Sequence, residues 1–549
     1  MESRGEELSP AESGDGSARG PGSVSSSRTG HHATLVASGI LASRLAGFVR
    51  QHFLARMLGL SDASDAFSAA FRIPNFLQNL FGEGVLSASF IPVYARLLGE
   101  GDDEEATRVA AAVGALLAVC TSVIVLVGMA ATPLLIDAIA PGFEGAKRTL
   151  TVDLVRILFP GAGLLVLSAW CLGILNSHHR FLLSYAAPMA WNLAIVAALL
   201  LARGAGDPDR IAVAAAWGSF AGSGLQVLVQ LPSVVALLGR IVGPVSAARG
   251  HVATVLRNFL PVFVGRGVVQ ISAYVDTVIA SLLPAGAVAA LSSAQVLSVL
   301  PVSLFGMSIS AAELPAMSRA SGGEEHVAEE LRRRLDGGLR LIAFLVVPSA
   351  MAFLALGDLL AAALFQAGRF TRADSVYVWG ILAGSAVGLL ASTLGRLYAS
   401  TWYALRDTRT PLRFALVRVA LTIALGLLFA LPLPRLLGID PKWGAAGLTA
   451  SAGIAAWVEL FLLRRALGFR IGRTGLDSGY VARLWASAAI AAAVGWGVKL
   501  AVGLDHPVVV GTLAVAAYGA AYFAVTAALG LGEGRRFLAR IPVVGARLR

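Results

Sequence analysis

The chain has 549 residues, of which 56% are hydrophobic and 14% are charged, and its formal net charge at pH 7 is +11. Soluble domains carry about 25% charged residues, so this composition excludes an ordinary soluble protein. Apolar stretches recur from end to end, and each is long enough to cross the hydrocarbon core of a bilayer as a helix. The short alternating segments of a transmembrane barrel are not seen. We therefore expect an all-α polytopic membrane protein.

The first segment, residues 1–32, is rich in Ser, Gly and charge and predicts a disordered tail. After it, the hydropathy pattern predicts about fourteen transmembrane helices, an even number that places both termini on one side. The expected spans are 33–57, 66–97, 107–138, 149–175, 181–202, 211–238, 253–283, 288–317, 338–365, 374–402, 411–431, 443–464, 482–503 and 507–531.

The first two spans carry charges inside apolar sequence, including Arg44, Arg50, Asp65, Arg72 and Glu83. A cation at the bilayer centre costs roughly 2.5–3.5 kcal/mol and is tolerated where it faces a wet cavity or a partner. These arginines therefore favour a path for an anion. Two simpler interpretations stay open: Arg44 could reach the headgroups along its aliphatic stem, and Asp65 could only cap a helix.

The basic residues of the loops gather after even-numbered spans and in the C-terminal tail, at 330–335, 464–473 and 532–549. The positive-inside rule makes this side cytoplasmic, together with both termini. We interpret the positive net charge as topology and contact with anionic lipid headgroups, not as a nucleic-acid surface.

An internal repeat links the two halves of the chain. FGEGVLSASFIPVYAR at 81–96 returns as FGMSISAAELPAMSR at 305–319, and Ser177 and Pro188 return 223 residues later (400 − 177 and 411 − 188). A constant offset across helix pairs predicts two parallel six-helix lobes with a cavity between them. The expected division is an N-lobe at 33–240, a C-lobe at 250–465, two extra helices at 480–531 and a basic cytoplasmic tail at 532–549.

Several motifs in this order resemble the MurJ/MviN lipid II flippases of the multidrug/oligosaccharidyl-lipid/polysaccharide exporter superfamily. They are SRLAGFVR at 43–50, DAFSAAFRIPN at 65–75, IAPGF at 139–143, LNSHHRF at 175–181, LFQAGRFT at 364–371 and RDTRTP at 406–411. The resemblance implies a transporter, not an enzyme. It implies export of undecaprenyl-diphosphate-MurNAc-pentapeptide-GlcNAc (lipid II) from the cytoplasmic to the periplasmic leaflet of a bacterial inner membrane, by alternating access, for peptidoglycan synthesis.

The diphosphate of such a substrate needs fork-shaped donors, which arginine supplies, whereas the tail can stay in lipid at a gap between the lobes. The resemblance assigns roles in the cavity to residues of this sequence. We add Arg266, which we expect to be a cation of the second lobe. The expected headgroup-binding residues are Arg44, Arg50, Arg72, Asn75, Arg266 and Arg396. The expected gating or ion-pair residues are Asp65, Glu83, Asp276 and Arg418.

Three positions depart from the charges found in the family: Gln51, Gln78 and Val296. These departures leave the identity of the lipid-linked substrate open. The family's sodium site would fall on Asp276, but span 11 offers Arg418 where a polar ligand is expected. A Na⁺ site at Asp276 is therefore a weaker expectation than an ion pair.

No Walker A motif and no metal-ligand spacing is found, so we expect no cofactor and favour the membrane potential as the driving force. Two alternatives to the lipid II flippase remain. One is an exporter of another lipid-linked saccharide or an amphipathic molecule, and the other is a non-transporting scaffold for the cell-wall synthesis machinery.

Overall fold

The computed structural model describes residues 23–81, 83–239, 249–321, 323–502 and 506–539, with the backbone alone for stretches of α1, α3 and α10. All regular structure in these residues is helical. The principal helices are α1 (Ser23–Leu58), α2 (Asp62–Phe81), α3 (Glu83–Ser89), α4 (Ile91–Gly99), α5 (Asp103–Ala130), α6 (Thr132–Ile139), α7 (Gly145–Ser177), α8 (Phe181–Leu201), α9 (Pro208–Leu238), α10 (Arg249–Ser281), α11 (Ala287–Pro301), α12 (Ser308–Ser318), α13 (Glu324–Phe365), α14 (Arg372–Ala404), α15 (Arg409–Ala430), α16 (Pro432–Leu436), α17 (Gly444–Ile471), α18 (Ser478–Ala501), α19 (Pro507–Ala528) and α20 (Gly532–Ala539).

Eleven helical segments within the described residues are long and apolar enough to cross a membrane, which confirms the polytopic all-α class. α1, α2 and α10 are not among them, so the count of fourteen stays a prediction. α2 carries two acidic residues in its first turn and Arg72 further on, and such charges lower its hydropathy. α1 already begins at Ser23, earlier than the expected start at residue 33.

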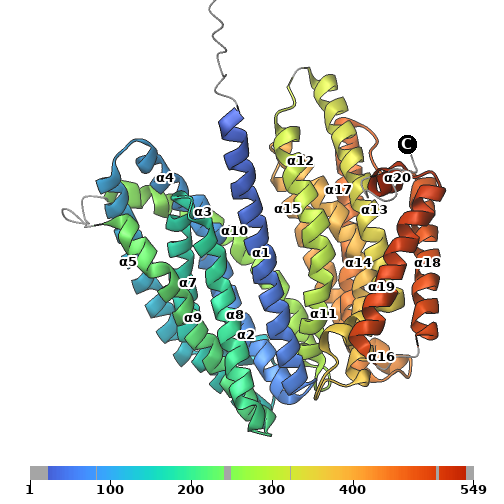
Figure 1. Cartoon of the computed structure of the whole chain (residues 1–549), viewed down its shortest axis with the longest axis horizontal. Coiled ribbons are helices and arrows are strands. Elements are labelled where there is room, and N and C mark those ends of the chain that lie inside the picture. The colour runs from blue at the N-terminus through green and yellow to red at the C-terminus, as the bar shows by residue number, and fades with distance from the viewer. Residues whose placement is uncertain (1–22, 82, 240–248, 322, 503–505, 540–549) are drawn as a thin grey trace, which may run out of the picture.

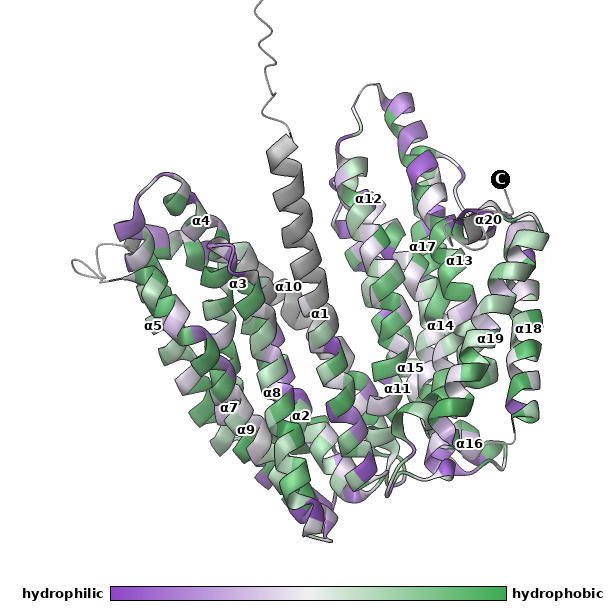
Figure 2. Ribbon diagram, in the orientation of Figure 1, coloured by the Kyte–Doolittle hydropathy of each residue, from purple (hydrophilic) through white to green (hydrophobic). Residues whose placement is uncertain are grey.

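The helices form two bundles that meet at one end and diverge towards the other (Figure 1). We call α1–α9 the N-bundle and α11–α19 the C-bundle. The wide end carries α4, α12 and α20, and the narrow end carries α16. Figure 2 shows apolar residues along most of the helix length, with hydrophilic residues gathered towards helix ends. Two buried apolar clusters lie in the two bundles, and the C-bundle cluster takes in Ala69 and Phe143 of the N-bundle.

One long helix of each bundle is broken at corresponding places of the repeat. In the N-bundle, α2 continues as α3 and α4, and in the C-bundle, α11 continues through a π-helical segment, Val302–Met307, into α12. Proline lies inside or near these breaks in both copies, at Pro74 and Pro92 and at Pro301 and Pro315. Proline removes a backbone donor and bends a helix. The sequence repeat thus corresponds to a repeated interruption of the backbone.

α10 contacts both bundles. In its first half, Phe263 packs edge-on against Phe81 of the N-bundle, with ring centroids 5.0 Å apart. In its second half, Ile279 and Ala280 belong to the buried cluster of the C-bundle. One continuous helix therefore joins the two halves of the molecule.

The two helices beyond the repeat extend the C-bundle. The Tyr518 and Tyr522 hydroxyls donate to backbone carbonyls of α13, and Lys499 of α18 lies 2.6 Å from the Asp358 carboxylate. α20 then returns onto α19, where Phe537 stacks on Phe523 with ring centroids 4.0 Å apart. α18 and α19 are thus anchored to α13.

Candidate functional site

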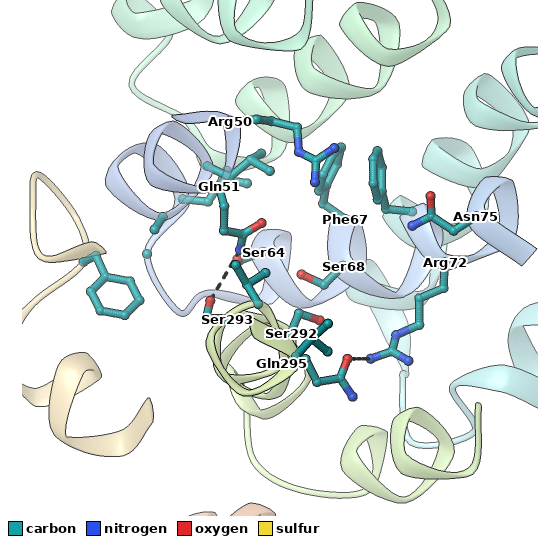
Figure 3. A pocket seen from close by; sticks show the side chains of 18 of the residues that line it. Arg50, Gln51, Ser64, Phe67, Ser68, Arg72, Asn75, Ser292, Ser293 and Gln295 are labelled. Carbon is teal, nitrogen blue, oxygen red and sulfur yellow. Dashed lines mark hydrogen bonds between the residues drawn. The ribbon is translucent and has the colours of Figure 1, made fainter. Parts of the chain in front are cut away.

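A cavity of about 400 Å³ lies where the two bundles meet. It is lined by α1 and α2 on one side and by α10 and α11 on the other, with Phe370 from the loop before α14. Figure 3 shows Arg50, Arg72 and Asn75 around this space, with serines and Gln295 of α11 nearby. The polar lining residues are Arg50, Gln51, Ser64, Ser68, Arg72, Asn75, Asn79, Tyr274, Ser292, Ser293 and Gln295.

Arg50 is held by neutral groups. Its Nη1 donates to the Asn192 side-chain oxygen at 3.0 Å, and its guanidinium carbon lies 5.0 Å and 5.3 Å from the ring centroids of Phe71 and Trp191. These two rings stack on each other. The Nε of Arg50 is buried and has no hydrogen-bond partner among the described residues, and no described carboxylate pairs with the group. Arg50 therefore keeps a donor and its charge for an anion.

Arg72 connects the two bundles. Its Nη2 donates to Gln295 Oε1 at 3.0 Å, and its backbone carbonyl accepts from the Tyr274 hydroxyl at 2.7 Å. Asp276 on α10 lies within electrostatic reach of the same guanidinium. Binding at Arg72 would thus be felt by α10 and α11 of the opposite wall.

The positions that depart from the family charges lie in or beside this cavity. Gln51 lines it and donates to the Ser293 hydroxyl at 3.4 Å, and Val296 lines it from α11. Gln78 is not part of the lining, but its neighbour Asn79 is. The cavity therefore holds two arginines among amides and hydroxyls, a donor-rich surface for a phosphorylated group.

The other expected cations lie elsewhere. Arg44 is exposed and donates to the Ser303 hydroxyl across the bundles at 3.2 Å. Arg396 of α14 is exposed and lies near Arg418, which pairs with Glu459 at 3.1 Å. None of these three lines the 400 Å³ cavity. The expected cations therefore divide between the central cavity, the exposed contact of Arg44 across the bundles and a separate charged group of the C-bundle.

Two expected residues cannot be placed. The side chains of Arg266 and Glu83 lie outside the described residues, although both belong to helices, α10 and α3. Their roles as a headgroup cation and a gating acid stay predictions.

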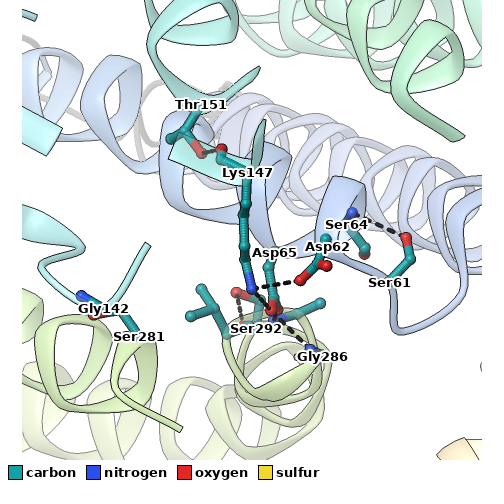
Figure 4. Close-up of polar contacts among 12 residues, drawn as sticks. Ser61, Asp62, Ser64, Asp65, Gly142, Lys147, Thr151, Ser281, Gly286 and Ser292 are labelled. Atoms are coloured by element: carbon teal, nitrogen blue, oxygen red, sulfur yellow. Dashed lines mark hydrogen bonds and ion pairs between the residues drawn. The ribbon is translucent and has the colours of Figure 1, made fainter. Parts of the chain in front are cut away.

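Asp65 closes the narrow end (Figure 4). The backbone N–H groups of Gly286 and Ala289, at the start of α11, donate to its two carboxylate oxygens at 2.7 and 2.8 Å. Lys147 of α7 lies 2.6 Å from the same carboxylate and 2.9 Å from Asp62. Asp65 is therefore a helix cap, but it caps a helix of the opposite bundle, where a negative charge also complements the helix dipole.

The first turn of α11 depends on the Asp65 carboxylate, because its own N-cap residue, Gly286, has no side chain that could accept hydrogen bonds from the free backbone N–H groups. Gly286 has φ +88°, and an added Cβ would lie 2.9 Å from the Leu60 carbonyl oxygen. A second contact lies nearby, where the Gly142 N–H of the N-bundle donates to the Ser281 hydroxyl at the end of α10, at 3.2 Å. The narrow end is thus closed by backbone groups in tight register.

The neighbours of Asp276 do not fit a Na⁺ site. Arg72 and Arg418 both lie within electrostatic reach of its carboxylate, so two guanidinium groups already act on the charge that a Na⁺ ion would balance. Among the described residues, no group of three or more His, Cys, Asp or Glu side chains is placed to hold a metal ion. The Na⁺ expectation stays a prediction that these neighbours do not support.

Sequence reasoning missed four contributors: Asn192, Gln295, Lys147 and Glu459. Asn192 and Glu459 are lone polar residues in predicted spans, and that isolation was the available signal, because a polar side chain in an apolar helix needs a partner. Gln295 follows two serines in its span, and Lys147 lies just before the span expected at 149–175, so neither carried such a signal.

Comparisons with known proteins agree with one another. The family described as "Lipid II flippase MurJ" matches residues 54–518. A "Lipid II flippase MurJ" of Burkholderia cenocepacia is 33% identical over 440 residues, 78% of this chain and 82% of the relative. A "Probable lipid II flippase MurJ" of Rhizobium meliloti is 31% identical over 455 residues, 82% of each chain.

Solved structures are similar in fold. One described as "Lipid II flippase MurJ, inward closed conformation" has TM-score 0.73 at 21% identity, covering 90% of this chain and 98% of that one. An inward-facing MATE family transporter of the MOP superfamily has TM-score 0.64 at 18% identity, covering 78% of this chain and 95% of that one. Both likenesses concern the arrangement of helices.

Proposed function

Because the chain belongs to the lipid II flippase MurJ family, we propose that it moves lipid II across a bacterial inner membrane by alternating access. The observation that carries the substrate-binding part is the environment of Arg50. This arginine faces a cavity between the bundles and is held by an amide and two aromatic rings in place of a described carboxylate. Export of another lipid-linked molecule and a scaffold role are not favoured by these relatives.

The distribution of basic residues supports placing the wide end on the cytoplasmic side, with both termini. The first turns of α13 lie at that end, and they carry Arg332, Arg333 and Arg334. α20, with Arg535 and Arg536, lies at the same end and would contact anionic headgroups. The described conformation is then open to the cytoplasm. Contact with the cell-wall synthesis machinery stays a prediction.

In the proposed cycle, the diphosphate enters from the wide end and binds Arg50 and Arg72. Arg72 already donates to Gln295 on the opposite wall, so an anion shared with it draws α2 and α11 together. Closure there must be matched by opening at the narrow end, where the Asp65 contacts with α11 separate. The membrane potential favours outward movement of anionic cargo, by about 2.3 kcal/mol per charge per 100 mV.

Complementation of a flippase-depleted bacterium tests the proposal. Wild type is expected to restore growth and Arg50→Ala to fail at equal membrane levels, because the buried donor is lost. Arg50→Lys keeps a charge without the planar fork and should restore growth only partly. Arg96→Ala is the control, since Arg96 is exposed at the end of α4. Failure of wild type despite insertion, or full growth with Arg50→Ala, would contradict the proposal.

A further inference from the structure

A second cavity, of about 780 Å³, lies beside the first and is apolar. It is bounded by α2 and the α5–α7 segment of the N-bundle and by α10 and α15, and its lining is aliphatic or aromatic. Among the described residues of this lining, Tyr274 alone carries a hydroxyl, and that hydroxyl donates to the Arg72 carbonyl. A volume of this size is in the range of ligand cavities, about 300–1,000 Å³.

This cavity is continuous with the surface that faces lipid. Val123 and Val127 of α5 are exposed by 54% and 61%, and Ile423 and Leu427 of α15 are also exposed. In the most apolar part of the span Arg409–Leu436, which contains α15, only 11% of the residues are buried. In a membrane, acyl chains cover such a surface, so a hydrocarbon chain can enter this space sideways without crossing water.

An aromatic pair separates the two cavities. Phe76 and Tyr274 line both of them, and their rings meet edge to face with centroids 5.5 Å apart. Arg72 lies on the polar side of this pair, and Ile73 and Leu77, from the same helix, lie on the apolar side. A molecule with an anionic head and a hydrocarbon tail fits this arrangement, with its junction at the aromatic pair.

We propose that the apolar cavity is the subsite for the part of the polyprenyl chain nearest the diphosphate of the transported lipid. This assignment rests on the proposed function and refines the expectation that the tail stays in bulk lipid. A diphosphate carries more negative charge and more acceptor oxygens than the phosphodiester of a bilayer phospholipid, so it binds more strongly beside Arg72. A diphosphate bound there sets its first isoprenoid units against Phe76 and Tyr274. The aromatic pair then aligns head and tail during transport.

Photocrosslinking in proteoliposomes tests this assignment. The probe is undecaprenyl diphosphate with a diazirine in an isoprenoid unit near the diphosphate, and crosslinked peptides are mapped by mass spectrometry. We expect labelling of the α5, α10 and α15 segments that line the cavity, competed by unlabelled undecaprenyl diphosphate. Any labelling of these segments by a diazirine phosphatidylglycerol probe should be displaced by unlabelled undecaprenyl diphosphate.

Ile423→Trp is the test variant, because a large ring on that wall takes up part of the cavity and narrows it. Leu428→Trp is its matched control, since Leu428 is exposed on the same helix outside the cavity. Ile423→Trp should lower labelling by about tenfold, equivalent to losing the burial of about two methylene groups. Leu428→Trp should leave it unchanged.

Absence of labelling at these peptides, equal labelling in both variants, or phosphatidylglycerol labelling that undecaprenyl diphosphate cannot displace would overturn the subsite. Crosslinking reports binding, so it is independent of transport. If wild type restores growth but the probe labels Ile423→Trp as strongly as wild type, only the subsite is contradicted. If wild type fails to restore growth, the proposed function is contradicted instead.

Discussion

Replacing Asp65 with Asn should weaken the closed narrow end and shift the molecule away from the described conformation. The Asp65 carboxylate accepts two backbone N–H bonds from the start of α11, across the bundles. Its contact with Lys147 lies inside the N-bundle and persists when the bundles separate, so it does not bias the equilibrium between conformations. Only the contacts to Gly286 and Ala289 count.

The magnitude follows from those two bonds. Asn keeps one oxygen acceptor but presents an amide NH₂ to the second N–H donor, so about one hydrogen bond to a charged group is lost. Such a bond contributes about 1.5–3 kcal/mol. The ratio of the described conformation to its alternative should therefore fall by about 10- to 150-fold, since each 1.4 kcal/mol is a factor of ten.

Spin-label distance measurements would detect this shift. Labels on Glu104→Cys and Glu324→Cys, both exposed at the wide end, report the separation of the bundles after Cys120 and Cys171 are replaced by Ser. Wild type should give a long distance between the two labels, because the bundles diverge at this end. Asp65→Asn should add a second population of molecules with a shorter distance between the labels.

Asp62→Asn is the matched control for this measurement. Asp62 contacts the same Lys147, at 2.9 Å, but none of its described ion pairs or hydrogen bonds reaches α11. An unchanged distance distribution in Asp65→Asn, or an equal change in Asp62→Asn, would refute the role of the Asp65 contacts with α11 in holding the narrow end closed.

Three further outcomes are expected. Trp191→Leu removes one aromatic face from Arg50, and should raise the Kd for undecaprenyl diphosphate by about 2- to 30-fold in titration calorimetry, because a cation–π contact contributes about 0.5–2 kcal/mol; an unchanged Kd would contradict that role. Gly286→Ala should lower Tm and add the shorter spin-label distance, because its φ of +88° and the Leu60 oxygen leave no room for a Cβ; a wild-type melting curve would count against it. Replacing Na⁺ by K⁺ should leave flipping in proteoliposomes unchanged, because Asp276 already has two guanidinium neighbours; Na⁺-dependent flipping would overturn this.

Hydropathy was sufficient to predict the helical class, because an apolar run of membrane-spanning length favours a transmembrane helix. The internal repeat was sufficient to predict the paired bundles, because a repeated sequence pattern implies a repeated structural unit. They also indicated Arg50 and Arg72, since a cation in apolar sequence needs a wet or polar environment. The interruption of α2 could be expected in part from Pro74 and Pro92. The π-helical segment after α11 had no clear signal in the sequence.

Partners were harder to predict than positions. Asp65 reaches backbone N–H groups more than 200 residues away, and a backbone donor leaves no mark in the sequence. Arg418 meets Glu459 because α15 and α17 present those faces to each other, which depends on the rotation of each helix about its axis. Arg44 and Arg50 lie in the same motif, SRLAGFVR, but Arg44 is exposed, because six residues along a helix rotate a side chain by about 120° around the helix axis.

The shared helix α10 limits how the two bundles can move. Its N-terminal half is fixed by ring contacts to the N-bundle, and its C-terminal half is embedded in the apolar core of the C-bundle. The halves of the molecule are therefore not two free bodies joined by a loop. Any change of the angle between them must bend α10 or strip one of its ends from its neighbours, which makes this helix the mechanical coupling of the transporter.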